Sequence, residues 1–415
     1  MPHLNNKRLL LISNHNSYRI APYIKAAHNL GLQVTIASEG EHSLVSEVAN
    51  GLHINFSDKA STLVKILKEH VRHPFSGILG SDDQTVELAA RAAKALKLPH
   101  NPPQAARYSQ RKDLARIQLM LSGAPVPINC LLDLKLPIKE QMKGLPWPCV
   151  IKPLNMSASR GVIRADNEAE FLTACETLRP IVATARGSFE QNHLLIEDYI
   201  DGIEIAYEGY LHDNQLETIT IFDKPDPLVG PYFAETIYVT PSRLSDNLQN
   251  EIKHVLQHAC NAYGLNTGAI HAECRIDKNN KIWIVEIASR TIGGDCARML
   301  DNENHGIEEL AISLAIDSPI DINMTDQARG VMMIPILEKG LLKRVEGLLQ
   351  ANKVDNIDNI DIIIREGHEL IPLPEGNQYL GYIFASGETS EQVTAAIREA
   401  YACLKFVTAP VFKIG

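Results

Sequence analysis

Residues 268–298, GAIHAECRIDKNNKIWIVEIASRTIGGDCAR, decide how the rest of the chain is interpreted. Two runs of alternating apolar residues flank Lys278-Asn279-Asn280-Lys281, and Asn tolerates the positive φ that tight turns need. The pattern therefore predicts a β-hairpin. If Asn279 and Asn280 are its two loop residues, paired residue numbers sum to 559 and Glu273 lies opposite Glu286.

The alternation assigns the hairpin residues to two faces. One face carries His271, Glu273 and Arg275. The other is predicted to be the core face, and it carries Ala272, Cys274, Ile276, Trp283, Val285 and Ile287. Buried Cys274, and Cys296 further along, are interpreted as packing residues.

Two opposed carboxylates repel each other, and a divalent cation between them would remove that cost. Their hard oxygen atoms suit Mg²⁺. The alternative is a solvated face on which Arg275 and Lys281 soften the repulsion. Arg290 and the turn Gly293-Gly294 follow the second strand, and a guanidinium beside free backbone N–H groups favours phosphoryl chemistry.

Length and composition narrow the class of protein. A chain of 415 residues predicts two to four domains. Its net charge of −10 argues against nucleic-acid binding, which usually needs a basic surface. No apolar run approaches the ~18 residues of a membrane span. The apolar part of MPHLNNKRLLLIS is too short for a signal peptide, and the seven cysteines are scattered. These features predict a cytoplasmic protein with reduced thiols.

The first hundred residues alternate between strand and helix patterns, which predicts a doubly wound parallel sheet. The predicted strands are 7–13, 33–38 and 75–80, and the predicted helices are 21–30 and 85–98. The absence of G-x-G-x-x-G after the first strand argues against a hydride-transfer enzyme. Ser81-Asp82-Asp83 is interpreted as a helix cap alone.

The middle of the chain combines weak phosphate-binding signals. After a linker at 101–103 and a helix to Leu121, the apolar strand 147–152 ends on Lys152. A hydroxyl-rich loop at 155–162 follows it and precedes a helix from Asn167. Such a loop can hold phosphates through its N–H groups, although similar clusters are commonly plain turns.

The remaining residues predict two further units. Strands from residue 194 to residue 289 are expected to form one antiparallel sheet, with a helix at 246–263 and Lys224 closing one strand. Residues 320–415 form a last α/β unit with strands near 330–337 and 381–386. Its final helix begins with Thr389 as N-cap and Gln392 at the capping-box position.

Taken in this order, the motifs resemble the ATP-grasp superfamily of carboxylate–amine ligases, and most closely the L-amino-acid ligases that make dipeptides. The resemblance covers essentially the whole chain. It implies an α/β and α+β multidomain protein: an N-terminal Rossmann-like domain (1–100), a small or lid ATP-grasp subdomain (101–192), a large subdomain with the metal and substrate site (193–318), and a C-terminal ligase domain (319–415).

The resemblance assigns nucleotide contacts to residues in three stretches. Lys112 and Lys152 resemble the lysines that contact phosphates, and the loop 155–162, with Ser157, Ser159 and Gly161, resembles the flap over them. The hinge that reads adenine would use backbone groups at Asp198 and Ile200 and the side chain of Glu197. Glu204 matches the ribose-binding acid, and Lys224 resembles a further active-site residue.

The resemblance also assigns the reacting groups. Glu273 and Glu286 match the metal-binding pair, and Arg290 matches the arginine that steadies the transferring phosphoryl group. Gly293 and Gly294 resemble the turn that holds a substrate carboxylate. Many superfamily members read Glu-x-Asn-x-Arg where this chain has Ala288, which removes a metal-binding amide and favours the amino-acid ligases. His271 is either a proton acceptor or an ordinary strand residue.

The expected reaction joins an amino acid to an amine or a second amino acid through an acyl phosphate, using ATP with Mg²⁺ or Mn²⁺. The expected partners are small-molecule carboxylates and amines, not nucleic acid or membrane, and a homodimer is one open oligomeric state. The rival hypotheses are another ATP-grasp ligase or carboxylase with a different acid, and a non-catalytic nucleotide-binding module. The two lysines, both glutamates and Arg290 argue against the latter.

Overall fold

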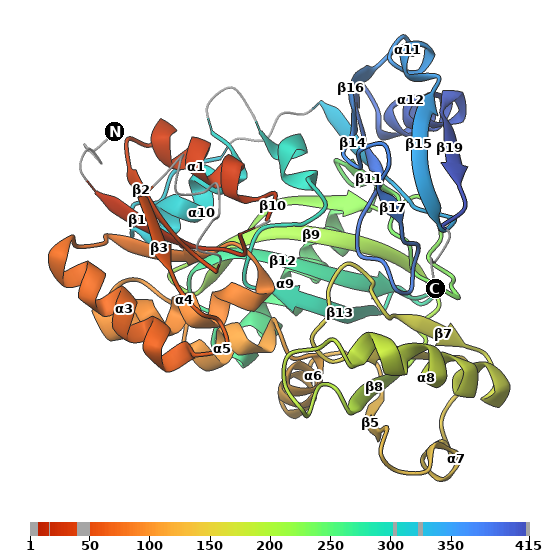
Figure 1. Ribbon diagram of the computed structural model, residues 1–415, viewed down its shortest axis with the longest axis horizontal. Helices are drawn as coiled ribbons and strands as arrows, with labels where there is room; N and C mark the ends of the chain where they lie inside the picture. The colour runs from red at the N-terminus through yellow and green to blue at the C-terminus, as the bar shows by residue number, and fades with distance from the viewer. Residues whose placement is uncertain (1–6, 16, 40–49, 302–304, 323–326, 412–415) are drawn as a thin grey trace.

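The computed structural model describes residues 7–15, 17–39, 50–301, 305–322 and 327–411. A long curved sheet runs through the middle of the molecule (Figure 1), with the N-terminal α/β part, a small sheet and the C-terminal part arranged around it. None of the helices within these ranges is long and apolar enough to cross a membrane.

The N-terminal part is a parallel sheet, as predicted, and it has four strands in the order β3-β2-β1-β4. Its strands are β1 (Arg8–Ile12), β2 (Gln33–Ser38), β3 (Asn50–His53) and β4 (Gly77–Gly80), and its helices are α1 (Ile20–Asn29), α3 (Lys59–Arg72) and α4 (Asp83–Leu96). The sequence pattern had indicated neither β3 nor α3. One face of the sheet packs on α1 and on the distant α10 (Ile307–Ala315), and the other on α3 and α4.

The segment at 101–103 is anchored and is not a free linker. The Asn101 side chain donates to the Thr267 carbonyl at 2.7 Å and accepts from the Asn266 N–H at 2.9 Å. Two helices follow, α5 (Pro103–Tyr108) and α6 (Lys112–Leu121).

The small sheet is antiparallel, in the order β5-β8-β6-β7, and its strands are β5 (Asn129–Asp133), β6 (Cys149–Pro153), β7 (Ile163–Ala165) and β8 (His193–Asp198). A short helix α7 (Ile138–Gln141) and the long helix α8 (Glu168–Val182) complete this part. The prediction that β8 belongs to one sheet with residues up to 289 is therefore wrong. An apolar strand can pair in either sheet, and only its neighbours decide which.

The large sheet has the order β13-β12-β9-β10-β11-β14-β18-β16. Its strands are β9 (Ile203–His212), β10 (Gln215–Asp223), β11 (Ile237–Thr240), β12 (Gly268–Ile276), β13 (Ile282–Ala288), β14 (Ala328–Ile334), β16 (Ile357–Ile362) and β18 (Gly381–Gly387). Helix α9 (Asp246–Tyr263) packs on one face and ends at Gly264, which has φ +79°. The sheet continues through the predicted domain boundary at residue 319.

The C-terminal part adds a second, three-stranded sheet in the order β17-β15-β19, made of β15 (Gly340–Glu346), β17 (Glu369–Leu370) and β19 (Lys405–Ala409). The short helices η1 (Cys296–Leu300) and α11 (Leu348–Ala351) and the long helix α12 (Ser390–Cys403) complete the chain. The predicted cap of α12 is confirmed, because the Thr389 hydroxyl accepts from the Gln392 N–H at 3.2 Å. The sequence pattern missed the short strands β15, β16, β17 and β19.

The central hairpin pairs Glu273 with Glu286, as predicted, but for a different reason. The turn has three loop residues instead of two: Asp277 N–H donates to the Lys281 carbonyl at 3.1 Å, and Asn280 alone has positive φ, at 59°. Near the turn, paired numbers therefore sum to 558. A β-bulge at Val285 then adds one residue to β13 and restores the sum of 559 at the glutamates.

The three-residue turn also corrects the predicted core face. Ile282 and Ile284 are buried opposite Ile276 and Cys274, whereas Trp283 and Val285 are only half-buried. Trp283 pairs with Arg275, donates from its ring N–H to Asp277 and lies under the Lys281 ammonium. A one-residue difference in register moves side chains to the opposite face, and that is why these two were misplaced.

A buried ion cluster joins the small sheet to the large one. Arg116 on α6 donates to the Glu197 carboxylate on β8 and to the Val285 carbonyl on β13. Lys152 on β6 lies 2.6 Å from the other oxygen of Glu197, which is only 2% exposed. Burial by itself would raise the pKa of Glu197, but the two cations lower it to about 2. The negative charge of Glu197 is thus part of what holds the two sheets together.

We expect Glu197→Gln to destabilise the protein by about 3 kcal/mol at pH 7, because two buried cations lose their counter-charge. The pKa of Glu197 is depressed, so its contribution is complete above about pH 5 and is lost as the pH falls toward 2. Urea unfolding at several pH values should show the difference between wild type and variant shrinking over that range. Glu217→Gln, which removes an exposed partner of Lys253, is the control and should give a small, pH-independent difference.

Candidate active site

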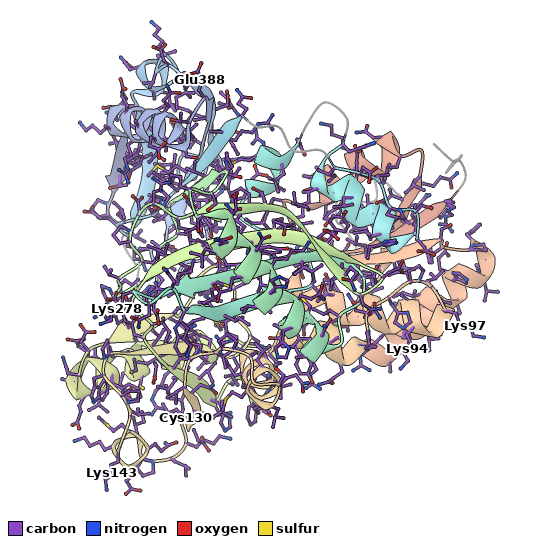
Figure 2. All side chains as sticks on the ribbon, turned by 180° about the vertical axis from the view of Figure 1, so that it is seen from behind. Lys94, Lys97, Cys130, Lys143, Lys278 and Glu388 are labelled. Atoms are coloured by element: carbon purple, nitrogen blue, oxygen red, sulfur yellow. The ribbon has the colours of Figure 1, made fainter. Side chains whose placement is uncertain are left out.

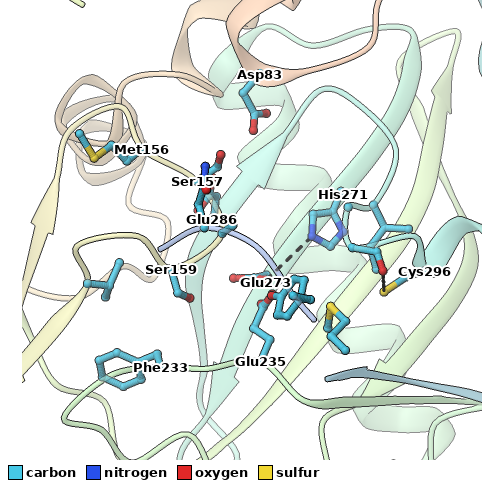
Figure 3. Close-up of a pocket in the computed structure, with 18 of the residues that line it drawn as sticks. Asp83, Met156, Ser157, Ser159, Phe233, Glu235, His271, Glu273, Glu286 and Cys296 are labelled. Atoms are coloured by element: carbon cyan, nitrogen blue, oxygen red, sulfur yellow. Dashed lines mark hydrogen bonds and ion pairs between the residues drawn. The ribbon is translucent and has the colours of Figure 1, made fainter. Parts of the chain in front are cut away.

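A cavity of about 770 Å³ lies where the four parts of the chain meet (Figure 3). All of the predicted site residues line it except Gly161 and Lys224. Its walls also include residues that the sequence analysis did not single out for the site, from the N-terminal loops, the large sheet and the C-terminal segment: Asn14, Tyr18, Arg19, Glu235, Tyr238, Arg365, His368, Tyr379 and Tyr382. The volume is within the usual range of small-molecule sites.

One end of the cavity is bounded by β8 and the residues that follow it. Asp198 and Ile200 line it, and Oδ1 of Asp198 is buried without a hydrogen-bond partner among the described residues. Arg275 donates to the Ile200 carbonyl at 2.8 Å and so fixes this segment. Both oxygens of Glu197 are already bound, by Arg116 and Lys152, so in this structure Glu197 holds Lys152 in place.

The loop 155–162 covers one side of the cavity. Ser157 and Ser159 line it, and Ser159 has positive φ, at 53°. Gly161 has φ +73° and donates its N–H to the Pro374 carbonyl at 3.0 Å, outside the cavity lining. A Cβ at Gly161 would lie 2.7 Å from Pro153, so this position needs glycine for packing as well as for backbone conformation.

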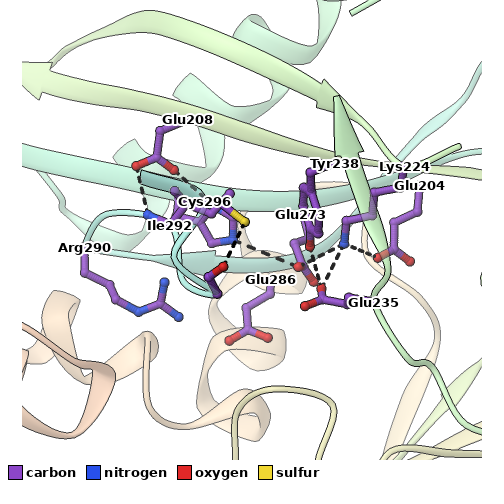
Figure 4. Close-up of polar contacts among 12 residues, drawn as sticks. Glu204, Glu208, Lys224, Glu235, Tyr238, Glu273, Glu286, Arg290, Ile292 and Cys296 are labelled. Carbon is purple, nitrogen blue, oxygen red and sulfur yellow. Dashed lines mark hydrogen bonds and ion pairs between the residues drawn. The ribbon is translucent and has the colours of Figure 1, made fainter. Parts of the chain in front are cut away.

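Glu273 and Glu286 stand side by side (Figure 4) and line the cavity (Figure 3), and each has its own lysine. Lys224 Nζ lies 3.1 Å from Glu273, and Lys112 Nζ lies 3.2 Å from Glu286. Arg275 pairs with Glu204 at 2.8 Å, and Lys281 stacks on Trp283. The alternative in which Arg275 and Lys281 soften the repulsion is therefore wrong, because cations from distant elements do so.

Lys224 lies at the centre of three carboxylates, one of which sequence reasoning missed. Its Nζ is 2.7 Å from Glu204 and 3.1 Å from both Glu235 and Glu273. Burial alone would lower the pKa of Lys224, but the three anions raise it well above its usual value. Oxygen atoms of the three glutamates lie within 4.8 Å of one another, so Lys224 occupies a place where a metal could bind.

No sequence pattern identifies Glu235, because it follows an irregular, proline-containing segment. In the structure its carboxylate accepts from Tyr238 at 2.7 Å and from Tyr379 at 3.1 Å, besides the contact with Lys224. Burial opposes the charge, yet Lys224 and the hydrogen bonds with Glu273 and Tyr238 lower the pKa of Glu235 to about 2. Burial raises the pKa of neighbouring Glu273 to about 8, although Lys224 opposes this shift.

His271 lines the cavity beside Glu273, with its Nε2 4.0 Å from the Glu273 carboxylate. Its Nδ1 lies 3.1 Å from Glu208, which is fully buried and also accepts the Ile292 N–H at 3.0 Å. Burial, together with the charges of Arg290 and Lys224, lowers the pKa of His271 well below its usual value. Glu208 was not predicted, since an isolated glutamate in an apolar strand carries no signal of its own.

The segment after β13 forms the other end of the cavity. Arg290 makes two parallel hydrogen bonds of 2.8 Å to Asp83, from Nε and from Nη2. Burial by itself would lower the pKa of Arg290, but Asp83 raises it. Ser81-Asp82-Asp83 is therefore more than a helix cap: Asp82 forms the capping box with Thr85, and Asp83 binds the arginine.

Gly293 and Gly294 line the cavity next to Arg290. Gly294 has φ +62°, and a Cβ there would lie 2.5 Å from the Met333 sulfur, so both conformation and space require glycine. Next to Gly293 lie Tyr18 and Arg19, which belong to the loop after β1. Carboxylates, ammonium groups, a guanidinium and a glycine turn thus face one enclosed space, which suits the transfer of a phosphoryl group to an acid.

Three family models match the chain. They describe an ATP-grasp N-terminal domain (24–100), an ATP-grasp domain (145–299) and an L-amino acid ligase C-terminal domain 2 (332–409). Together the two ATP-grasp models span more than half of the 415 residues.

Curated relatives match at low identity. An alanine–anticapsin ligase of Bacillus amyloliquefaciens is 28% identical over 219 residues, which are 49% of this chain and 46% of the relative. The chain therefore spans about half the length of this relative. An L-arginine-specific L-amino acid ligase of Bacillus subtilis is 20% identical over 74% of this chain and 73% of its own length.

Solved structures share the fold over nearly the whole chain. The crystal structure of an L-amino acid ligase from Bacillus licheniformis has a TM-score of 0.80 at 22% identity, covering 97% of this chain and 99% of its own. An N5-carboxyaminoimidazole ribonucleotide synthetase from Thermotoga maritima has a TM-score of 0.70 at 15% identity, covering 97% and 99%. The chain carries ATP-grasp domains together with a C-terminal domain of the L-amino acid ligase type.

Proposed function

We propose that the protein is an ATP-dependent carboxylate–amine ligase that joins an amino acid to an amine or to a second amino acid. The observation that carries the proposal is the layout of the cavity. Lysines, serines and the β8 segment line one end, Arg290 and the Gly293-Gly294 turn line the other, and the paired glutamates lie between them. The names of the two curated relatives, both amino-acid ligases, support the same reaction class.

ATP would bind at the β8 end. Asp198 has a buried acceptor that no described residue binds, and Ile200 has a carbonyl held in place by Arg275, so both suit an adenine ring. Glu204 would bind ribose hydroxyls after exchanging its contacts with Lys224 and Arg275. The phosphate groups would be met by the ammonium groups of Lys112 and Lys152 and by the loop that carries Ser157, Ser159 and Gly161.

Glu273 and Glu286 have the chemistry of a Mg²⁺ or Mn²⁺ site: two opposed carboxylates at the edge of a phosphate pocket. Lys112 and Lys224 lie beside these carboxylates, and when a metal and phosphates bind they would move to phosphate or to the other glutamates. The metal, when bound, neutralises charge on the transferring phosphoryl group. Because Ala288 supplies no ligand, any second ion would rely on Glu286, phosphates and water.

The reaction would have two steps. An oxygen of the substrate carboxylate attacks the γ-phosphorus, which forms an acyl phosphate and releases ADP. The amine nitrogen then attacks the acyl carbon, and the C–O bond to phosphate breaks to release inorganic phosphate and the amide. Arg290 would steady the phosphoryl oxygens, and the N–H groups of Gly293 and Gly294 would hold a carboxylate. The proton of the amine would pass to His271 Nε2 or to a phosphate oxygen.

The proposal is tested by measuring phosphate release from Mg-ATP across pairs of amino acids, with hydroxylamine as a trap for the acyl phosphate. We expect release that requires one amino acid plus hydroxylamine, or two amino acids together. The amino acid that supports trapping is the one whose carboxylate is activated. Release with bicarbonate or a non-amino-acid carboxylate alone would indicate another ATP-grasp reaction, and binding of ATP without any release would indicate a binding module.

We expect Glu286→Gln to reduce phosphate release by about 100-fold or more, since the amide cannot neutralise a metal ion next to Glu273. Calorimetry should also show weaker binding of Mn-ATP, while metal-free ATP binds at least as well as before. The control is Glu217→Gln, which changes an exposed carboxylate on the same sheet. A Glu286→Gln protein with the wild-type rate and wild-type metal affinity would disprove the metal assignment.

A further inference from the structure

The segment 290–292, which follows β13, forms hydrogen bonds with two charged residues of the N-terminal part. Asp83 follows β4 and binds Arg290, while Arg19 follows β1 and donates to the carbonyls of Thr291 and Ile292 at 2.8 to 3.2 Å. In the order β3-β2-β1-β4, the chain reverses direction across the sheet between β1 and β4. The carboxyl ends of those strands are where open α/β sheets usually bind a ligand.

Asp83 occupies only some of the hydrogen-bond donors of Arg290. A guanidinium has five N–H groups in a rigid plane. Asp83 accepts from Nε and from Nη2, and the Thr291 carbonyl accepts from Nη1 at 2.9 Å. Among the described residues, two N–H groups of Arg290 have no acceptor, one on each terminal nitrogen, and Arg290 lines the cavity. Those two can bind an anion as a pair without breaking any contact that the described residues make.

Arg19 fixes the peptide units that follow. A trans peptide unit is planar, so its N–H points away from its carbonyl oxygen. Because the Thr291 carbonyl points to Arg19, the N–H of Ile292 points the other way, and there it donates to Glu208. In the same manner, the bond from Arg19 to the Ile292 carbonyl directs the N–H of Gly293 away from Arg19. The orientation of the glycine turn thus depends on contacts from the N-terminal sheet.

Helix capping does not account for Asp83. The capping box of α4 is made by Asp82 and Thr85, and Asp83 is the first residue of the helix. Its carboxylate makes a two-bond contact with a residue 207 positions away. A purely structural tether remains the alternative, and it predicts that loss of Asp83 affects stability but not the behaviour of Arg290 toward anions.

We propose that Asp83 is a positioning residue: it holds the Arg290 guanidinium so that its two remaining N–H groups face the transferring phosphoryl group. The N-terminal sheet thereby sets the geometry of the reaction. It does so from the carboxyl ends of its strands, where open α/β sheets usually bind a ligand. This inference rests on the proposed ligase function and adds a residue that the resemblance does not assign.

The first test is Asp83→Asn, which keeps the size of the side chain but opposes an amide NH₂ to the guanidinium and removes the charge. We expect kcat for phosphate release to fall about 10- to 100-fold while KM for ATP changes less than about twofold, since a small misplacement of a reacting group has such effects. Asp58→Asn is the matched control, because Asp58 caps the neighbouring helix α3 and touches nothing in the cavity.

A double-mutant cycle separates positioning from structure. If Asp83 acts through Arg290, Asp83→Asn should cause little further loss in an Arg290→Lys background. If the losses of kcat caused by the two substitutions multiply in the double variant, the proposal is overturned in favour of a tether. The same holds if the thermal unfolding midpoint of Asp83→Asn falls in parallel with its kcat.

A binding measurement tests Asp83 without turnover. The probe is tetrafluoroaluminate with Mg-ADP, which imitates a phosphoryl group in transfer. We expect Asp83→Asn to weaken its capture about 10-fold or more while Mg-ADP binding stays within about twofold. Equal capture by wild type and variant, or no capture by wild type, would overturn the proposal. Capture that depends on Asp83 in a protein that ligates no amino acid would contradict only the proposed function.

Discussion

The site depends on two carboxyl groups that the large sheet places side by side. Glu273 and Glu286 are directly opposite across β12 and β13, where like charges destabilise a strand pair. The chain compensates with one lysine for each glutamate: Lys112 from α6 and Lys224 from the end of β10. The carboxylates are therefore held close together in a half-buried place beside two ammonium groups, an arrangement that suits a metal ion and phosphates.

Buried pairs of opposite charges, and hydrogen bonds from charged side chains, also connect the parts of the molecule. Arg116 and Lys152 meet at Glu197 and link the small sheet to the large one, while Asp83 and Arg19 link the N-terminal sheet to the segment after β13. Each of these contacts is mostly buried and joins elements far apart in the chain. Removing one partner leaves an uncompensated charge, so the ion pairs that shape the cavity also oppose its disassembly.

Several sequence predictions failed for the same physical reason. The hairpin was assigned a two-residue turn, and the pairing of the glutamates came out right only because the bulge at Val285 cancels the extra loop residue. The same error put Trp283 on the core face. Strand β8 was assigned to the large sheet although it pairs with β5 and β6. In each case local periodicity is correct, but register and partner depend on contacts with other elements.

The sequence by itself determined the parallel N-terminal sheet, the central hairpin and most of the long helices, because periodicity, caps and turn residues act locally. The motifs that carry the family resemblance also identified site residues that, except for Gly161 and Lys224, line the cavity. Only the tertiary structure decided which charges meet: Glu235 with Lys224, Glu208 with His271, and Asp83 with Arg290. These partners lie 11, 63 and 207 positions apart, and no local pattern relates them. Their pairing follows from the crossing of strands and the docking of one sheet edge on another.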